Sequence, residues 1–184
     1  KDLIVKLTLL FHDISKPNCI TYDSDGVAHY YGHGAVSAEM TDKIMKRMKY
    51  DNDTREKVVE LIKYHDATIE PTHKHIKKWL NRLGEEQFRR LLKVRTADIL
   101  AQKTIPNDER FDRISMAFKL IDKILDAEEC FTLKDLAING KDLLALGIPE
   151  GKQIGEILNI LLNKVIDDEI ENNKDKLLNF VNNL

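Results

Sequence analysis

Apolar side chains recur at helical spacing along most of the chain, so the sequence predicts helices almost throughout. Residues 2–11 are apolar on nearly every side, and such a helix is expected to lie at the centre of the core. Further stripes with a three- or four-residue period are bounded by capping residues and breakers. The helices that they predict cover residues 35–48, Asn52 to about His65, 75–83, 85 to about 103, 110–126, 154–166 and a short segment after Asn173. The sequence therefore predicts an all-α protein.

Two features interrupt this helical pattern. Ile20–Tyr22 and Val27–Tyr30 flank the turn-rich segment Asp23–Gly26, which predicts a small β-hairpin between helices. Gly84 and the segment Ile105–Asn107 are expected to break helices, because glycine and proline disfavour a continuing helix. The predicted fold is therefore a helical bundle with one short β insertion.

The spacing of apolar residues and glycines changes after Cys130. Short glycine-punctuated pieces replace the long helical stripes, and an amphipathic helix follows them. With 184 residues, of which 42% are hydrophobic, the chain can bury one core and a small second one. We therefore expect a helical domain at residues 1–129 and a helical tail subdomain at residues 130–184.

Charge and cysteine content narrow the class of protein. The formal net charge of -2 gives no bulk attraction to nucleic acid, so an RNA contact would have to come from a local cluster. Cys19 and Cys130 form no CxxC pair, which indicates a reducing compartment, by default the cytoplasm, and no thiolate zinc site. No apolar run approaches the ~20 residues of a membrane span, so no membrane partner is expected.

The pair His12–Asp13 is the most informative candidate for chemistry. It ends the most apolar helix of the chain, where ionisable groups are desolvated unless a partner compensates them. A divalent metal ion would do so, since imidazole and carboxylate are both metal ligands. The pair alone is a weak signal, because the dipeptide is common by chance.

Three further residues are expected to face the interior near this pair. His65 extends the apolar stripe of its helix, Asp98 lies at the flank of a buried helix face, and His33 stands between two glycines just before a helix. The predicted divalent-metal ligands are therefore His12, Asp13, His33, His65 and Asp98. In the alternative interpretation each His is a hydrogen-bonded core residue, and Asp98 pairs with an arginine of its own helix.

Basic residues are concentrated between positions 74 and 95, whereas acidic residues dominate positions 167–171. A basic helical face is what contact with RNA phosphates requires. The residues expected to make such contacts are Lys74, Lys77, Lys78, Arg82, Arg89, Arg90 and Lys93. Lysine and arginine at helical spacing also form ordinary solvated faces, so the charge pattern alone leaves both interpretations open.

Several motifs resemble those of HD-superfamily phosphohydrolases and, more narrowly, of bacterial CCA-adding tRNA nucleotidyltransferases. Leu9–Pro17, which reads LLFHDISKP, resembles the HD signature, and Gly26–Ala38 resembles the segment that follows it in CCA-adding enzymes. Tyr64–Asp66 and Arg95–Gln102 resemble later elements of the same domain. Residues 133–155 resemble the tail of those enzymes, which separates them from generic HD hydrolases.

This resemblance implies the HD domain and tail of a tRNA nucleotidyltransferase of the poly(A) polymerase family, with tRNA as the partner of the parent enzyme. It further implies catalytic roles for His12, Asp13 and His65, and a divalent metal such as Mg, Mn, Ni or Fe. The chain departs from the family pattern in three ways. No His precedes His12, so a ligand expected upstream is missing, and Ser15 replaces the usual Gly. No Gly-Ser followed by Asp-x-Asp marks a polymerising head, so this chain is not expected to polymerise by itself.

Two alternatives stay open at this point. One is a stand-alone HD phosphohydrolase that acts on nucleotides or 2′,3′-cyclic phosphates, with the metal activating a water molecule. The other is a non-catalytic all-α module that keeps the His and Asp residues as a core network. Metal analysis separates these two, and the gene's upstream segment separates both from a tRNA nucleotidyltransferase.

Overall fold

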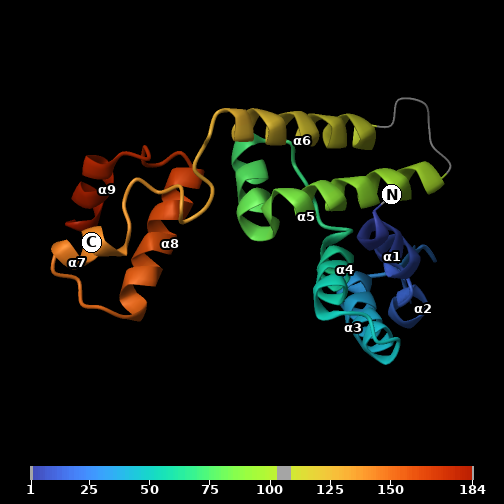
Figure 1. The fold of residues 1–184 in the computed structure, drawn as a ribbon. Helices are drawn as coiled ribbons and strands as arrows, with labels where there is room; N and C mark the ends of the chain where they lie inside the picture. Colours follow the sequence, from blue (N-terminus) through green and yellow to red (C-terminus); the bar gives the residue numbers. More distant parts are fainter. Residues whose placement is uncertain (1, 103–108, 184) are drawn as a thin grey trace. The chain divides into compact units, whose positions relative to one another are not determined.

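The computed structural model describes residues 2–102 and 109–183, and most of them are helical (Figure 1). The helices are α1 (Leu3–Phe11), α2 (Lys16–Cys19), α3 (His33–Arg47), α4 (Asn52–Tyr64), α5 (His73–Ala101), α6 (Glu109–Asp126), α7 (Gly140–Ala145), α8 (Lys152–Ile166) and α9 (Lys174–Val181). Strands β1 (Thr21–Tyr22) and β2 (Ala28–His29) form an antiparallel hairpin in which Thr21 pairs with His29. The predicted all-α class with a small hairpin is confirmed.

The chain groups into two compact units, Lys1–Ile69 with Glu85–Ser115 and Glu70–Gly84 with Met116–Leu184. Helix α5 contributes to both and is interrupted at Gly84, whose φ of 71° and ψ of 167° are not helical. A positive φ of this kind favours glycine, so the prediction that Gly84 breaks a helix is confirmed. The predicted helix end near Lys103 and the predicted breaker Ile105–Asn107 lie outside the described residues. The domain boundary drawn at residue 130 stays a prediction.

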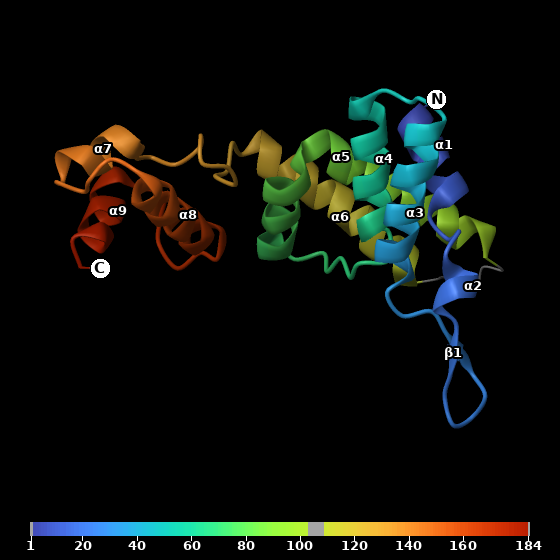
Figure 2. The ribbon, with the colours of Figure 1, turned by 90° about the horizontal axis from the view of Figure 1, so that it is seen from below.

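The first unit is built around α4, against which α1 and α3 both pack. Figure 2 shows α3 and α4 next to each other, with α1 beside them. Val58, Leu61 and Ile62 of α4 are completely buried. The expectation that α1 lies at the centre of the core was wrong, because Leu3 is 56% and Leu10 67% exposed. Ile4 and Leu7 lie on the buried side of α1, whereas Leu3 and Leu10 lie in contact with solvent.

The second unit has its own apolar core between α7, α8 and α9. Its buried members are Cys130, Leu136, Ile138, Leu143, Ile157, Leu161, Leu162, Val165, Ile166 and Leu177. Asn139 and Asp142 form a capping box at the start of α7, and Asn173 caps α9 through its side chain. The two helices predicted at the end of the chain are thereby confirmed. In the part of the chain that the structure describes, no helix combines the length and the apolarity needed to cross a membrane.

Candidate metal centre

Four helix ends meet in the first unit and bring five ionisable side chains together. His12 and Asp13 follow the last residue of α1, and His65 follows the last residue of α4. His33 is the first residue of α3, and Asp98 lies in the last turn of α5. All five predicted metal ligands therefore come from positions where a helix begins or ends, and the structure places them in one cluster.

Glycines on either side of His33 permit this approach. Gly32 has a φ of 73° and stands at the N-terminus of α3, where a residue with a Cβ would be strained. A Cβ built on Gly34 would lie 3.4 Å from the carbonyl oxygens of Ile62 and Lys63, and 3.6 Å from Cε1 of His65. The start of α3 thus lies directly against the end of α4, as the two flanking glycines suggested.

The three histidines share one hydrogen-bonding pattern, in which Nδ1 lies near a backbone carbonyl three residues earlier. The distances are 2.9 Å from His12 to Leu9, 2.8 Å from His33 to Tyr30 and 2.7 Å from His65 to Ile62. A carbonyl oxygen can only accept, so each Nδ1 must carry the hydrogen. In the neutral ring Nε2 then holds a lone pair, which is the arrangement found in metal-binding histidines whose other nitrogen is fixed by the protein.

These Nε2 atoms point toward one another. Nε2 of His33 lies 3.0 Å from Nε2 of His65. The His12 and His65 rings meet edge to face, with centroids 5.0 Å apart. Two lone pairs at 3.0 Å repel each other unless a proton or a metal ion lies between them, so the arrangement itself favours a cation.

Two carboxylates complete the cluster. Oδ1 of Asp13 lies 3.3 Å from Nε2 of His33 and 3.6 Å from Nε2 of His65. Its other oxygen, Oδ2, lies 3.3 Å from Nε2 of His12. Oδ1 of Asp98 approaches the same His12 atom at 3.6 Å. Asp13 therefore touches all three imidazoles, and Asp98 flanks one of them.

Two atoms of this cluster are buried and have no hydrogen-bond partner. Among the residues that the structure describes, Nε2 of His12 and Oδ1 of Asp13 make no hydrogen bond. Buried polar atoms normally have one, so such orphans require an explanation. Ligand atoms of His12, Asp13 and His65 all lie within 4.8 Å of one another. Ligands bound at ~2.1 Å lie about 3.0 Å apart at right angles and about 4.2 Å apart on opposite sides of an ion, so one divalent ion would draw these donors slightly closer together.

Burial and neighbouring charges set the ionisation of the cluster. Burial lowers the pKa of His65, and the charges of His12 and His33 lower it further, against the opposing effects of the Ile62 carbonyl and Asp13. Burial raises the pKa of Asp13, but a hydrogen bond from Lys16 and the charges of His12, Lys16 and His65 outweigh it and lower that pKa. At neutral pH these shifts favour a neutral His65 and an ionised Asp13, the forms that bind metals.

Lys16 is a member of the site that the sequence reasoning did not single out. Its Nζ donates to Oδ2 of Asp13 at 2.6 Å, and it lines a cavity of about 380 Å³ beside the cluster. Tyr30 and Tyr31 line the same cavity. The spacing of three residues between Asp13 and Lys16 could have indicated the ion pair, since such neighbours often meet on one face. The catalytic and metal-binding roles assigned from the sequence stay predictions.

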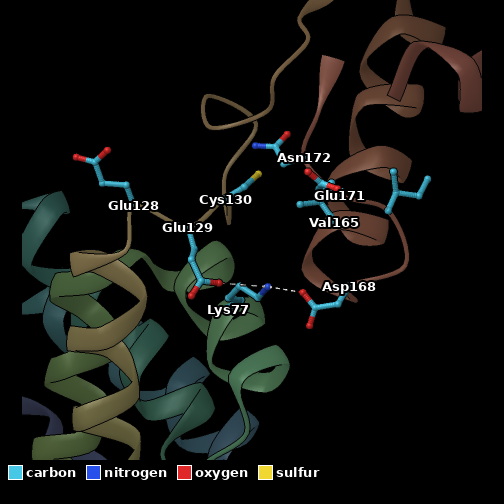
Figure 3. Close-up of a pocket in the computed structure, with 9 residues that line it drawn as sticks. Lys77, Glu128, Glu129, Cys130, Val165, Asp168, Glu171 and Asn172 are labelled. Atoms are coloured by element: carbon cyan, nitrogen blue, oxygen red, sulfur yellow. Dashed lines mark hydrogen bonds and ion pairs between the residues drawn. The ribbon is translucent and has the colours of Figure 1, made fainter. Parts of the chain in front are cut away.

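The basic residues expected to contact RNA have acidic neighbours within the chain. In the second unit Nζ of Lys74 and Nζ of Lys78 lie 3.1 and 2.7 Å from the same oxygen of Asp167. Lys77, whose side chain is only 4% exposed, lies 3.0 Å from Asp168 and 3.6 Å from Glu129 (Figure 3). Asp167 and Asp168 of the acidic segment 167–171 therefore form ion pairs with lysines of the basic segment.

The arginines of the predicted RNA face divide between the units. Arg82 belongs to the second unit, together with the three lysines, whereas Arg89, Arg90 and Lys93 belong to the first. Arg90 is 2.8 Å from Asp2 and 2.6 Å from Glu86, and Arg89 is 2.8 Å from Glu85. Lys93 is exposed. An RNA contact by these residues stays a prediction, and most of them would first have to exchange an internal ion pair for a phosphate.

Comparisons with known proteins place these features in a family context. Residues 33–181 match the family model described as tRNA nucleotidyltransferase domain 2, putative. An A-adding tRNA nucleotidyltransferase of Deinococcus radiodurans is 26% identical over 162 residues, which is 87% of this chain and 37% of that protein. A CC-adding tRNA nucleotidyltransferase of Thermus thermophilus is 23% identical over 162 residues, 87% of this chain and 35% of that protein. The chain thus spans little more than a third of these relatives. No solved structure matches it significantly.

Proposed function

Because the chain belongs to the tRNA nucleotidyltransferase domain 2 family, we propose that it is the helical part of a tRNA nucleotidyltransferase and that its His–Asp cluster binds a divalent metal ion. The observation that carries the metal assignment is the convergence of the Nε2 atoms of His33 and His65 at 3.0 Å, beside the orphaned oxygen of Asp13. The family and the two relatives support tRNA as the substrate of the parent enzyme.

Nucleotide addition itself would depend on residues outside this chain. The two relatives add nucleotides to tRNA according to their names, and this chain corresponds to 37% and 35% of their lengths. A helical part of this kind would help to hold the tRNA while the polymerising part acts on its end. The chain alone is therefore expected to show no nucleotide transfer.

The donor set favours some metals over others. His12, His33 and His65 would supply imidazole nitrogens, with Asp13 as the central carboxylate and Asp98 at the flank. Mg²⁺ prefers oxygen ligands, whereas Mn, Fe, Ni and Zn accept imidazole together with carboxylate. A bound ion of this type lowers the pKa of a coordinated water and neutralises charge on a phosphoryl group. The site would then support hydrolysis of a phosphoester such as a nucleotide or a 2′,3′-cyclic phosphate.

Residues of the chain itself prepare the site for such a substrate. The three backbone carbonyls hold each imidazole in the tautomer that presents Nε2. Lys16 keeps Asp13 ionised and oriented through its hydrogen bond to Oδ2. The cavity of about 380 Å³ gives a phosphoester room beside the cluster, with Tyr30 and Tyr31 in its wall.

Two observations favour a non-catalytic core network as the second candidate. Lys16 already places a cation 2.6 Å from Asp13, and a shared proton would also relieve the contact between His33 and His65. Hydrolysis of 2′,3′-cyclic AMP by EDTA-treated protein, resupplied with Mn²⁺ or Ni²⁺, distinguishes the two candidates. We expect slow metal-dependent hydrolysis that His12→Ala abolishes and His75→Ala, which removes an imidazole in the other unit, leaves intact. Equal rates in wild type and His12→Ala would contradict a catalytic role for the cluster.

A further inference from the structure

A second cavity in the first unit carries a concentration of arginines that the metal cluster does not use. Its volume is about 330 Å³, and among the described residues its walls contain Arg95, Arg110, Arg113 and one carboxylate, Asp66. The charged side chains that line it therefore carry an excess of two positive charges. Asp66 also lines the cavity beside the metal cluster, so the two sites are neighbours.

Two of the guanidinium groups donate hydrogen bonds to uncharged acceptors in the chain. Arg95 donates from Nη1 to the carbonyl of Ala67, and the His65 carbonyl lies 3.4 Å from the same nitrogen. Arg110 donates from Nη1 to the side-chain oxygen of Gln102 at 2.8 Å. Hydrogen bonds of this kind orient a guanidinium without cancelling its charge.

The electrostatics of the cavity favour an anion. Three arginines and one carboxylate, Asp66, line the described part of its wall. Arginines keep their protons at any physiological pH, and Arg113 has one further acidic neighbour, Glu109, at 3.9 Å. An anion placed between the guanidinium groups would reduce their mutual repulsion.

The rest of the wall strengthens this preference. Ile99 and Ile114 line the cavity and are only 4% and 8% exposed, so its floor is apolar and poorly hydrated. An attraction between charges is stronger there than in bulk water. An uncharged apolar ligand would gain contact with the isoleucines but would desolvate the guanidinium groups without compensation.

We propose that the cavity lined by Arg95, Arg110 and Arg113 binds a phosphate group, carried either by an RNA backbone or by a free nucleotide. The planar guanidinium presents parallel N–H donors that match two phosphate oxygens, which makes arginine the preferred residue for this anion. The proposal is independent of the metal site, because none of the three arginines belongs to the His–Asp cluster.

The test measures binding of a fluorescently labelled tRNA transcript by anisotropy at low ionic strength, in EDTA so that the metal site plays no part. Arg110→Ala and Arg113→Ala are compared with Arg47→Ala, which removes the same charge from an exposed position of α3 in the same unit. Each cavity variant is expected to weaken binding by about tenfold or more, as for a lost charge-assisted hydrogen bond. It should also flatten the salt slope by about one unit.

Competition separates the two sources of the phosphate. If AMP displaces the tRNA and adenosine does not, and Arg113→Ala weakens AMP binding, the pocket takes the phosphate of a free nucleotide. If AMP fails to compete while Arg113→Ala still weakens tRNA binding, the pocket takes a backbone phosphate. The side chain of Arg113 is 62% exposed, so its truncation keeps the core intact, and a thermal melt checks this. Equal tRNA and AMP binding by Arg110→Ala, Arg113→Ala and Arg47→Ala would overturn the proposal.

Discussion

Nε2 of His33 lies 3.0 Å from Nε2 of His65, and Nδ1 of each ring donates to the backbone carbonyl three residues earlier. This contact links the start of α3 to the end of α4. It is unfavourable when both rings are neutral and nothing lies between them, and worse when both are protonated. The pH dependence of the stability of the metal-free protein is derived from His65, which burial disfavours in its protonated form.

Acid should destabilise the metal-free protein in a defined pH range. The pKa of His65 in the folded chain is lowered by burial below its ordinary value of 6.5. The folded state then binds fewer protons than the unfolded state, so the free energy of unfolding falls as pH drops below that value. Urea denaturation in EDTA at pH 7.5 and 5.5 should show this loss, and His65→Gln should reduce it. The lowered pKa of Asp13 acts only below pH 3.8, so it does not interfere. An unchanged pH dependence in His65→Gln would contradict the assignment.

Gly34 should tolerate a methyl group but no larger side chain. A Cβ at this position meets the carbonyl oxygens of Ile62 and Lys63 at 3.4 Å, which is ordinary contact, and Cε1 of His65 at 3.6 Å. Gly34→Ala should therefore change the free energy of unfolding by less than about 1 kcal/mol, since alanine also favours the helix. Gly34→Val should push α3 from α4 and cost about 1–3 kcal/mol. Thermal melts of the two variants measure this, and equal stabilities would show that the approach of the two helices is looser than described.

Lys77 should matter for stability more than for RNA binding. Its side chain is 4% exposed, between Glu129 and Asp168. Lys77→Ala leaves these carboxylates without their buried partner and should cost about 2–4 kcal/mol, somewhat less than a fully buried pair because Asp168 is exposed. Lys74→Ala, at a half-exposed position, should cost less than about 1 kcal/mol. Denaturation curves compare the two, and similar small losses would mean that Lys77 makes no essential contact.

Asp167 should restrain the predicted RNA face. Lys74 and Lys78 both pair with it, so Asp167→Asn would release two cations at once. If these lysines contact RNA, the substitution should increase tRNA affinity and steepen its salt dependence by up to about two units. Glu156→Gln provides the matched control, because it removes a carboxylate from an exposed ion pair with Lys152 on α8. Equal affinities of both variants would indicate that Lys74 and Lys78 form only a solvated face.

The sequence predicted the parts of the molecule that depend on local periodicity. The longer helices, the hairpin and the break at Gly84 each have a local signal, and the inward positions of His65 and Asp98 follow from helical spacing. The short helices α2 and α7 were not predicted, because four and six residues are too few to show a helical period. The ion pairs of the second unit could not be predicted from local periodicity. Lys77 and Asp168, for example, are 91 positions apart, so their pairing depends on the tertiary fold. The exposure of Leu3 and Leu10 was missed for the same reason, since apolarity does not reveal which face of α1 finds a partner. The arginine cavity likewise combines residues of α5 and α6 with the chain after α4.

The most direct test of the account is a calorimetric titration of EDTA-treated protein with Mn²⁺ or Ni²⁺ at pH 7.5. Wild type and His75→Ala should each bind one ion per chain with the same affinity, because His75 lies outside the cluster. His33→Ala and His65→Ala should each weaken binding by ~100-fold or more, since affinity depends on the number of ligands. Binding by His65→Ala that equals wild type, or no saturable binding by wild type at all, would contradict a metal centre at the junction of α1, α3 and α4.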